Sequence, residues 1–373
     1  MKTRSLRIII SGGGSGGHIF PAVSIANALK EGDQNIEILF IGAKGKMEME
    51  KVPKAGYTIE GLWISGFHRK KMWRNILFPF KLVASLFKAE RLIRNFKPDV
   101  VVGVGGFASG PTLEVATRKR IPTLIQEQNS YPGITNKLLA KKVTRICTAY
   151  PKMEKYFPAD KILLLGNPVR ASLLQSQVSR KEAFNYFGFD DSKKTIFMIG
   201  GSLGAWSFNR MMKKQTDFFK KNKEIQILWQ CGKIYEAEYA ASDTASLQNV
   251  KTMAFIDRMD LAYEMADVII ARAGAGTIAE LAIIGKPVVL VPSPNVAEDH
   301  QTFNAMAFVE VDAAILVADK VIEEELLERT KSLLENEKKQ SELSTNIKKL
   351  AITDAAKKIA DQVVKLASEN KSN

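Results

Sequence analysis

The sequence predicts an α/β fold built from two Rossmann-like domains, each a parallel sheet covered by helices. Short apolar runs alternate with helical stretches along almost the whole chain. Such runs are typical of strands that are buried on both faces of a parallel sheet. The alternation restarts near residue 194, where a second series of strand, glycine turn and helix begins. The restart favours two similar domains over one large sheet. A chain of 373 residues is also long enough for about two hydrophobic cores.

The apolar runs give the expected strands of each domain. In the first domain they lie at residues 6–10, 36–41, 99–102 and 122–125, and a helix is expected at about 21–30. In the second domain they lie at residues 195–199, 225–229, 268–271 and 288–291. From residue 322 onward the chain is rich in Glu, Lys and Leu and lacks Gly and Pro, which predicts helices.

The domain boundary is expected where Gly166, Asn167 and Pro168 interrupt the chain. Residues 1–167 then form an amino-terminal domain, residues 168–350 form a carboxy-terminal domain, and residues 351–373 form a helix that packs back on the first domain.

The composition indicates a basic, cytoplasmic protein. Lys and Arg number 54 against 40 Asp and Glu, so the net charge is +14. Two cysteines, Cys147 and Cys231, and the absence of a CxxC pair argue against a disulfide framework and a structural zinc. No apolar window is long enough to span a membrane. The charge is compatible with a nucleic acid, a membrane surface or an anionic substrate.

The first glycine loop, residues 11–18, reads SGGGSGGH between a strand and a helix. Its Gly12, Gly14 and Gly17 satisfy GxGxxG, but no acidic residue closes the second strand at Ala43, which disfavours a dinucleotide. The loop also lacks the lysine of a P-loop. Free N–H groups at the start of a helix still predict an anion site here.

His18 stands beside this loop and is a candidate for proton transfer. A second glycine cluster at residues 103–111 follows another expected strand of the same sheet. Loops at the carboxyl ends of neighbouring parallel strands line the crevice where ligands bind. The two clusters together could therefore hold a diphosphate.

In the second domain, residues 271–280 read as a strand end, a glycine-rich turn and a helix. The turn and Arg272 suit a phosphate, and Glu280 could accept the hydroxyls of a ribose. No Asp-x-Asp motif occurs, so a metal-dependent sugar-nucleotide site is not supported. Helix N-termini and Arg would instead neutralise a pyrophosphate leaving group.

Taken together, seven segments resemble the MurG family of UDP-N-acetylglucosamine transferases in bacterial peptidoglycan synthesis. They occur in order across nearly the whole chain: residues 11–21, 103–111, 127–136, 167–170, 200–205, 272–280 and 299–305. The resemblance implies a GT-B fold, with two parallel-sheet domains facing across a cleft. It implies inverting transfer of GlcNAc from UDP-GlcNAc to the 4-hydroxyl of MurNAc in undecaprenyl-pyrophosphoryl-MurNAc-pentapeptide (lipid I), which gives lipid II.

The resemblance also implies a metal-independent hexosyltransferase without a cofactor, peripheral on the cytoplasmic face of the inner membrane. Its partners would be UDP-GlcNAc, lipid I and other cell-wall synthesis proteins, and no nucleic acid. The implied catalytic residue is His18 as the base, with Glu127 as its rival.

The family's binding roles carry over by motif. Residues expected to contact UDP-GlcNAc are Ser15, Gly16, Gly17, Asn129, Arg170, Ser202, Ile256, Arg272, Ala275, Gly276, Thr277, Glu280 and Gln301. Residues expected to contact the acceptor diphosphate are Gly13, Gly14, Gly105, Gly106, Ser109 and Asn136. Four positions depart from the family pattern, namely Leu203 in place of Gln, Phe107 in place of Tyr, Gln126 in place of the His of some members, and Ser15 in place of Thr, which keeps the hydroxyl.

The stretch from Phe67 to Pro98 holds nine Lys and Arg and a single acid, Glu90, interleaved with aromatic and aliphatic residues. This pattern suits an amphipathic surface on anionic lipid, although a core helix with a solvated face or an RNA-binding patch remains open. The wider alternatives are a related GT-B enzyme that acts on a soluble acceptor or epimerises UDP-GlcNAc, an NAD-dependent dehydrogenase, and a nucleic-acid-binding protein.

Overall fold

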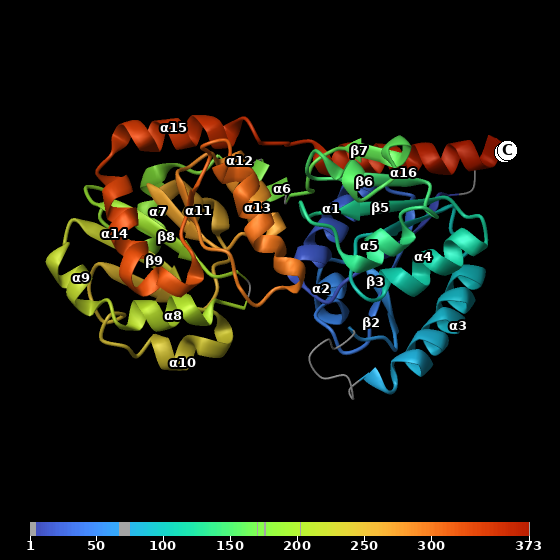
Figure 1. Cartoon of the computed structure of the whole chain (residues 1–373), viewed down its shortest axis with the longest axis horizontal. Helices are drawn as coiled ribbons and strands as arrows, with labels where there is room; N and C mark the ends of the chain where they lie inside the picture. The colour runs from blue at the N-terminus through green and yellow to red at the C-terminus, as the bar shows by residue number, and fades with distance from the viewer. Residues whose placement is uncertain (1–4, 67–74, 170, 175–176, 202, 373) are drawn as a thin grey trace. The chain divides into compact units, whose positions relative to one another are not determined.

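The computed structural model describes residues 5–169, 171–174, 177–201 and 203–372, apart from residues 67–74. The chain forms two compact units, one of Met1–Val169 with Thr353–Asn373 and the other of Arg170–Ile352. Each unit is a parallel sheet covered by helices (Figure 1). The expected fold class is thereby confirmed.

The sheet of the first unit has seven strands, all parallel, in the order β3-β2-β1-β4-β5-β6-β7. Because β1 lies between β2 and β4, the strand order reverses at the β1/β4 pair. The strands are β1 (Arg7–Ser11), β2 (Glu37–Ala43), β3 (Thr58–Leu62), β4 (Val100–Gly103), β5 (Thr123–Glu127), β6 (Arg145–Thr148) and β7 (Ile162–Leu164).

Helices cover both faces of this sheet. Successive side chains of β1 point to opposite faces, and each set packs against helices. Ile8 and Ile10 pack in one core cluster with α1 (Gly16–Gly32) and α16 (Ala355–Ser372). Ile9 packs in the other cluster, to which α3 (Phe78–Phe96), α4 (Ser109–Arg118) and α5 (Ile134–Leu139) contribute. The short helix α2 (Glu48–Lys54) connects β2 to β3.

Helix α16 belongs to the first unit although the second unit precedes it in the chain. It contributes Ile359, Ala360 and Val363 to the core beside α1. In Figure 1 it is the red helix at the carboxyl terminus, next to the strands of the first unit.

The sheet of the second unit has six parallel strands in the order β10-β9-β8-β11-β12-β13. Its order reverses at the β8/β11 pair. The strands are β8 (Lys194–Ile199), β9 (Ile225–Gln230), β10 (Val250–Met253), β11 (Val268–Ala271), β12 (Val288–Leu290) and β13 (Ile315–Leu316).

The helices of the second unit again cover both faces. One core cluster joins Met198 and Trp229 to α8 and α14. On the opposite side of β8, the rings of Phe197 and Tyr263 meet edge to face with centroids 5.6 Å apart. The helices are α6 (Ala171–Leu174), α7 (Arg180–Phe187), α8 (Trp206–Lys213), α9 (Thr216–Lys221), α10 (Glu236–Tyr239), α11 (Met259–Met265), α12 (Ala275–Ile284), α13 (His300–Val309), α14 (Ile322–Leu334) and α15 (Glu337–Lys348).

Each sheet therefore has one switch point, and a glycine-rich loop follows each of the two central strands there. Ligands of open α/β sheets bind at such points, beyond the carboxyl ends of the strands. No helix in the described part of the chain is both long and apolar enough to cross a bilayer.

Candidate active site

The two glycine loops of the first unit touch each other backbone to backbone. A Cβ atom on Gly106 would lie 2.2 Å from the carbonyl oxygen of Gly13, and Gly106 has a φ of +85°. A Cβ atom on Gly12 would meet Val104 at the same short distance. Only glycine fits this approach, since any side chain would push the loops apart. The loop after β1 and the loop after β4 thus form one surface.

His18 lies in the first turn of α1, on this surface. Its Nδ1 is 3.0 Å from the carbonyl oxygen of Gly13 and 3.3 Å from Oγ of Ser15. A carbonyl oxygen can only accept, so Nδ1 carries the proton in this contact. In the neutral ring Nε2 then holds the lone pair. A Cβ atom built on Gly105 would lie 2.9 Å from Nε2, which places that nitrogen against the second loop.

The carboxylate of Glu127, at the end of β5, is 1% exposed and accepts four hydrogen bonds. Oε1 accepts from the backbone N–H of Asn129 at 3.0 Å and from its Nδ2 at 3.2 Å. Oε2 accepts from the N–H of Gly133 at 3.1 Å and from Nδ2 of Asn136 at 2.8 Å. Burial raises the pKa of Glu127, and these donors oppose that effect. The arrangement fixes the loop between β5 and α5.

Asn136 connects this loop to the glycine surface. Its Nδ2 would be 3.7 Å from a Cβ atom on Gly105, whose other neighbour is His18. Its Oδ1 is buried and accepts from none of the described residues. The structure therefore brings His18, Gly105, Asn136 and, through Asn136, Glu127 to one place in the first unit.

Gln126 and its neighbours form a buried network of amides behind the site. Its Nε2 donates to Oδ1 of Asn167 at 3.1 Å, and Nδ2 of Asn167 donates to the carbonyl of Gln128 at 2.9 Å. Nε2 of Gln128 donates to the carbonyl of Val104 at 2.9 Å, which supports the second glycine loop.

Glu48, the first residue of α2, is a member of the site that the sequence analysis missed. Its side chain is 1% exposed. Oε2 accepts from the N–H of Gly14 at 2.8 Å, and Oε1 accepts from the N–H of Ala43 at 3.0 Å. No acidic residue ends β2 in the sequence, but the side chain of Glu48 reaches the end of β2 from α2. The N–H of Gly14 is donated to this carboxylate, which leaves it engaged within the protein and not directed at an acceptor diphosphate.

The remaining residues expected at the first site lie at the starts of α4 and α1. Oγ of Ser109 donates to the carbonyl of Gly106 at 2.9 Å, which ties α4 to the second loop. Ser15 is the N-cap of α1 and makes no side-chain cap hydrogen bond. Gly16 and Gly17 are the first residues of that helix, whose leading N–H groups have no acceptor within the helix.

In the second unit, the loop after β8 packs on the end of β9. A Cβ atom on Gly204 would lie 2.0 Å from the carbonyl oxygen of Cys231, so this contact also requires glycine. The N–H of Gly200 donates to Oε1 of Gln230 at 3.2 Å. Leu203 in this loop is exposed.

Arg272, at the end of β11, is 8% exposed and makes contacts within the protein. Nη1 lies 2.6 Å from Oδ1 of Asp319 and donates to the carbonyls of Val291 and Pro292 at 3.1 and 3.2 Å. Nη2 donates to Oγ of Ser207. Burial lowers the pKa of Arg272, and Asp319 acts against this shift. The guanidinium therefore supports the glycine-rich turn through these contacts, and its expected contact with a phosphate stays a prediction.

The N-terminus of α12 remains the candidate anion site of the second unit. Gly274 is its N-cap and Ala275, Gly276 and Thr277 form its first turn, which contains no acidic residue. Glu280 follows one turn later and is 7% exposed; its Oε2 accepts from the hydroxyl of Tyr263 at 3.2 Å. Asn304 of α13, which the sequence analysis did not single out as a site residue, donates to the carbonyl of Ala273 at 3.2 Å.

The last expected donor residues lie on neighbouring loops. Oε1 of Gln301 accepts from the N–H of Ser293 at 2.8 Å, which ties α13 to the loop after β12. Ile256 is buried in the loop between β10 and α11. Arg170 and Ser202 lie outside the described residues, as do residues 67–74 of the basic segment.

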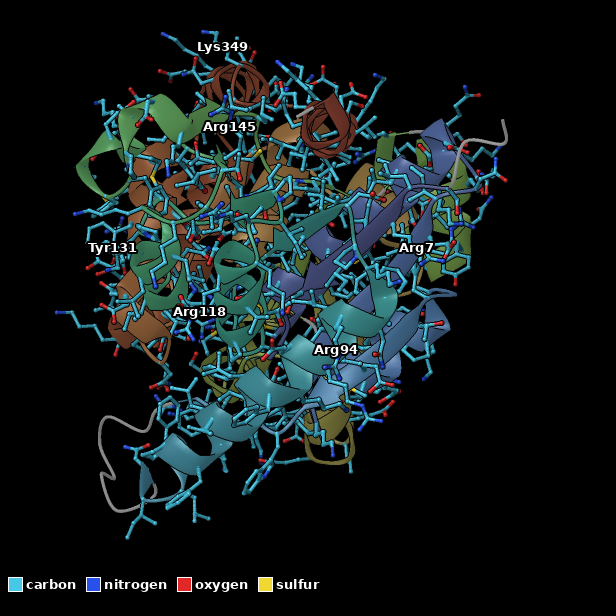
Figure 2. The ribbon with its side chains drawn as sticks, turned by 90° about the vertical axis from the view of Figure 1, so that its right-hand side faces the viewer. Arg7, Arg94, Arg118, Tyr131, Arg145 and Lys349 are labelled. Atoms are coloured by element: carbon cyan, nitrogen blue, oxygen red, sulfur yellow. The ribbon has the colours of Figure 1, made fainter. Side chains whose placement is uncertain are left out.

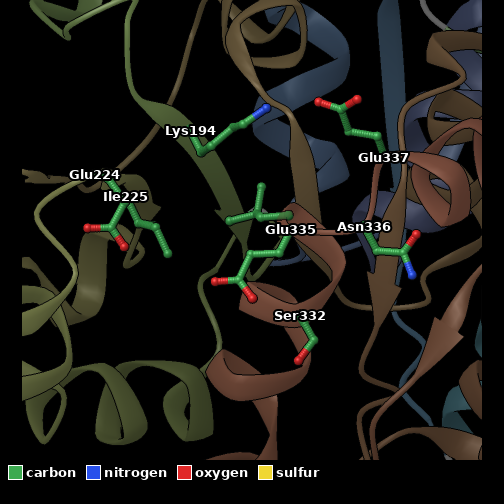
Figure 3. A pocket seen from close by; sticks show the side chains of 8 residues that line it. Lys194, Glu224, Ile225, Ser332, Glu335, Asn336 and Glu337 are labelled. Carbon is green, nitrogen blue, oxygen red and sulfur yellow. The ribbon is translucent and has the colours of Figure 1, made fainter.

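A hollow in the second unit is unrelated to these loops (Figure 3). Lys194 and Ile225, at the amino ends of β8 and β9, line it together with Glu335, Asn336 and Glu337. It opens at the amino ends of the strands, whereas the glycine loops follow their carboxyl ends. Three of its lining side chains are glutamates. Its charge and position do not suit a nucleotide diphosphate.

Comparison with known proteins matches both halves of the chain to one family. Residues 8–148 match the glycosyltransferase family 28 N-terminal domain, and residues 195–362 match the C-terminal domain of that family. A UDP-N-acetylglucosamine–N-acetylmuramyl-(pentapeptide) pyrophosphoryl-undecaprenol N-acetylglucosamine transferase of Phocaeicola vulgatus is 54% identical, over 98% of this chain and 97% of its own length. An enzyme of the same name from Flavobacterium psychrophilum is 52% identical, over 98% and 99%. The crystal structure of Acinetobacter baumannii MurG superposes with a TM-score of 0.76 at 29% identity, over 96% of this chain and 99% of that one.

Proposed function

This chain belongs to glycosyltransferase family 28, among the MurG transferases, and from that premise we infer that it transfers GlcNAc from UDP-GlcNAc to N-acetylmuramyl-(pentapeptide) pyrophosphoryl-undecaprenol. The observation that carries this conclusion is identity above 50% over nearly the full length of relatives with that activity in their names. The enzyme is a hexosyltransferase of peptidoglycan synthesis.

The two units divide the substrates in this proposal. The second unit binds UDP-GlcNAc, and the first turn of α12 supports this, because it is a helix N-terminus with small residues and no acid, which suits a diphosphate. Glu280 takes the ribose hydroxyls, since a buried carboxylate is an acceptor only. The first unit binds the acceptor at the surface formed by the loops after β1 and β4.

His18 is the general base of the proposed reaction. The 4-hydroxyl oxygen of MurNAc attacks C1 of GlcNAc from the face opposite the leaving group, so the new O4–C1 bond forms as the C1–phosphate oxygen bond breaks. The hydroxyl proton goes to Nε2 of His18, and UDP leaves with the bonding electrons. A general base typically contributes about 10²–10⁴-fold to the rate.

Glu127 suits a supporting role better than that of the base. Each carboxylate oxygen of Glu127 accepts two hydrogen bonds from the protein, which leaves little room for a substrate hydroxyl. By accepting these four hydrogen bonds, Glu127 holds Asn129 and Asn136 at the site. We therefore assign the proton transfer to His18 and the positioning of this loop to Glu127.

The proposed reaction is tested by incubating the protein with UDP-GlcNAc and a lipid I analogue and measuring UDP release and the disaccharide product. UDP release that depends on the analogue is expected. Release that is equally fast without the analogue, or formation of UDP-N-acetylmannosamine, would contradict transfer to lipid I.

The face of α3 that points away from the core supports peripheral docking on an anionic membrane. Phe80 and Phe87 are 68% and 71% exposed, and Val83 lies between them on the same stripe at helical spacing. Ile76, which precedes the helix, is also exposed. Arg91 and Arg94 extend this stripe toward the carboxyl end of α3 and are also exposed. Figure 2 shows Arg94 on α3 beside Arg118 on α4. Exposed aromatic residues next to basic ones are typical of helices that lie in a lipid interface.

Co-sedimentation with anionic vesicles at low salt tests this docking. The double variant Phe80→Ser, Phe87→Ser is expected to bind vesicles at least tenfold more weakly, since each ring loses about 2 kcal/mol of burial in the interface. The matched control is Leu138→Ser, an exposed apolar residue on α5. Equal binding of the wild type and the double variant would contradict docking through α3.

A further inference from the structure

One peptide group joins a buried carboxylate to the ring of His18. The peptide between Gly13 and Gly14 donates its N–H, on Gly14, to Oε2 of Glu48 at 2.8 Å. The same peptide accepts through its carbonyl oxygen, on Gly13, from Nδ1 of His18 at 3.0 Å. The order of groups is therefore carboxylate, peptide, imidazole, each joined to the next by a hydrogen bond.

Two glycines make room for this carboxylate. A Cβ atom on Gly13 would lie 2.2 Å from Cδ of Glu48, and one on Gly42 would lie 2.5 Å from Cγ. The second oxygen of Glu48 accepts from the N–H of Ala43 at 3.0 Å, which anchors the side chain to the end of β2. The carboxylate is thus held by backbone on two sides.

We propose that Glu48 is a positioning residue for His18, which it orients and makes more basic through the Gly13–Gly14 peptide. This inference rests on the proposed function, in which His18 is the base. A carboxylate at the N–H end of a peptide polarises that peptide and strengthens its carbonyl as an acceptor. The stronger acceptor holds the proton on Nδ1 and leaves the lone pair on Nε2. It also stabilises the imidazolium that forms when Nε2 takes the proton of the acceptor hydroxyl.

The arrangement follows the logic of a carboxylate–histidine pair, with one peptide inserted between the two side chains. No proton leaves Nδ1 or reaches Glu48 in this step. Both hydrogen bonds shorten as the ring becomes positive, and both relax when the ring returns its proton to solvent.

The charged side chains on the described elements around His18 are as follows. The second glycine loop, residues 103–109, has no titratable side chain, and the nearest charge from β5 is Glu127, through Asn136. On α2 the other charges are Glu50, Lys51 and Lys54, and Glu50 pairs with Lys54 at 2.6 Å. The charges of α1 itself, Lys30 and Glu31, are at its far end. On α16, Lys357 pairs with Asp361 and Lys365 with Glu369, and Lys358 pairs with Asp354 just before the helix.

The direct test is the titration of the His18 ring, followed by NMR through its Cε1 proton in the full chain. Only three histidines are present, so a His18→Gln variant assigns the signal. In Glu48→Gln the titration midpoint of His18 is expected to fall by about one pH unit, because the imidazolium loses a nearby negative charge. Glu48→Asp keeps the charge on a shorter side chain and is expected to give an intermediate midpoint.

The matched control is Glu50→Gln, which removes an exposed carboxylate from the same helix and is expected to leave the His18 midpoint unchanged. A His18 midpoint in Glu48→Gln equal to that of the wild type would overturn the inference. If Glu48→Gln does not fold, Glu48→Asp decides, and a midpoint equal to that of the wild type overturns it in the same way.

Kinetics give a second readout with the lipid I analogue. In Glu48→Gln the ascending limb of kcat/KM against pH is expected to move to lower pH by the same amount as the NMR midpoint, while UDP-GlcNAc affinity stays constant. A purely structural role would lower kcat/KM at every pH and leave the limb in place, which also overturns the inference. If the wild type transfers no GlcNAc, the proposed function fails, and the NMR titration still tests the link between Glu48 and His18.

Discussion

The loop after β1 and the turn after β11 each lie at the switch point of their sheet, yet buried side chains of opposite charge support them. Glu48 reaches the first loop from α2 and accepts the N–H of Gly14. Arg272 lies under the second turn and donates to carbonyls, Ser207 and Asp319. Both sites have a glycine-rich backbone followed by a helix.

The difference determines what each loop has left to offer a ligand. In the first unit a negative charge already occupies an N–H group, and the carbonyl of the same peptide holds His18, so this loop suits the handling of a proton. In the second unit the buried charge is positive and compensated by Asp319, and the first turn of α12 presents the positive end of a helix dipole, which suits an anion. Two similar loops are thus suited to an acceptor site and a nucleotide site.

The largest expected effect concerns the support of the second turn. Asp319→Ala removes the counter-charge of a buried guanidinium and is expected to lower the free energy of unfolding by about 3 kcal/mol. Urea denaturation measures this, and Lys320→Ala, at the exposed next position, is the control with no effect. Unchanged stability together with lost UDP-GlcNAc binding would mean that Arg272 contacts the phosphates after all.

The next effect tests the catalytic side of the comparison. His18→Ala is expected to lower kcat by at least about 100-fold, because it removes the general base. The KM for UDP-GlcNAc should change little, since the donor binds the second unit. Steady-state kinetics with the lipid I analogue give both values. Turnover close to that of the wild type would show that another group accepts the proton.

A smaller effect tests the nucleotide side. Glu280→Ala is expected to weaken UDP-GlcNAc binding about tenfold, equivalent to about 1.4 kcal/mol, through loss of charge-assisted hydrogen bonds to the ribose. Isothermal calorimetry measures the affinity, and Glu328→Ala, an exposed acid on α14, serves as the control. An affinity equal to that of the wild type would remove the ribose from the roles of Glu280.

The smallest effect is a pH dependence of stability that arises from Glu127. Burial raises its pKa in the folded protein. Its stabilising contribution is therefore complete below the pKa of the unfolded chain, about 4.3, and is lost as the pH rises through the folded pKa. The Tm of the wild type relative to Glu127→Gln should accordingly fall over this range, by on the order of 2 °C. A difference that grows with pH would contradict a raised pKa.

The fold could be predicted well where strands are buried on both faces. β1, β4 and β11 are continuous apolar runs that end in or before glycine turns, and each lies at the centre of its sheet. The strands that the sequence analysis missed are at or near the edges. β3 reads TIEGL and β10 reads VKTM, and both contain polar residues because an edge strand is less buried. Their pattern alone does not distinguish them from loops.

The site could be predicted where local sequence determines it. The glycines of residues 12–17 and 103–106 predict that the two backbones approach closely, and His18 is the next residue after the first group. Glu48 could not be found in this way, because its role depends on α2 folding back against β2 and on the missing Cβ atoms of Gly13 and Gly42. The surroundings of Arg272 could not be found in this way either. Its place in the sequence suits a phosphate, but Asp319, far along the chain, contacts its guanidinium.

The position of α16 also has a consequence for how the protein is made. The second unit is continuous in sequence, from Arg170 to Ile352, so every residue of its core is synthesised before α16. Most of the first unit is synthesised earlier, but its core beside α1 lacks three apolar residues until α16 is made. These are Ile359, Ala360 and Val363. The apolar face of the first unit therefore stays open while the later unit folds, and the order of folding need not follow the order of synthesis.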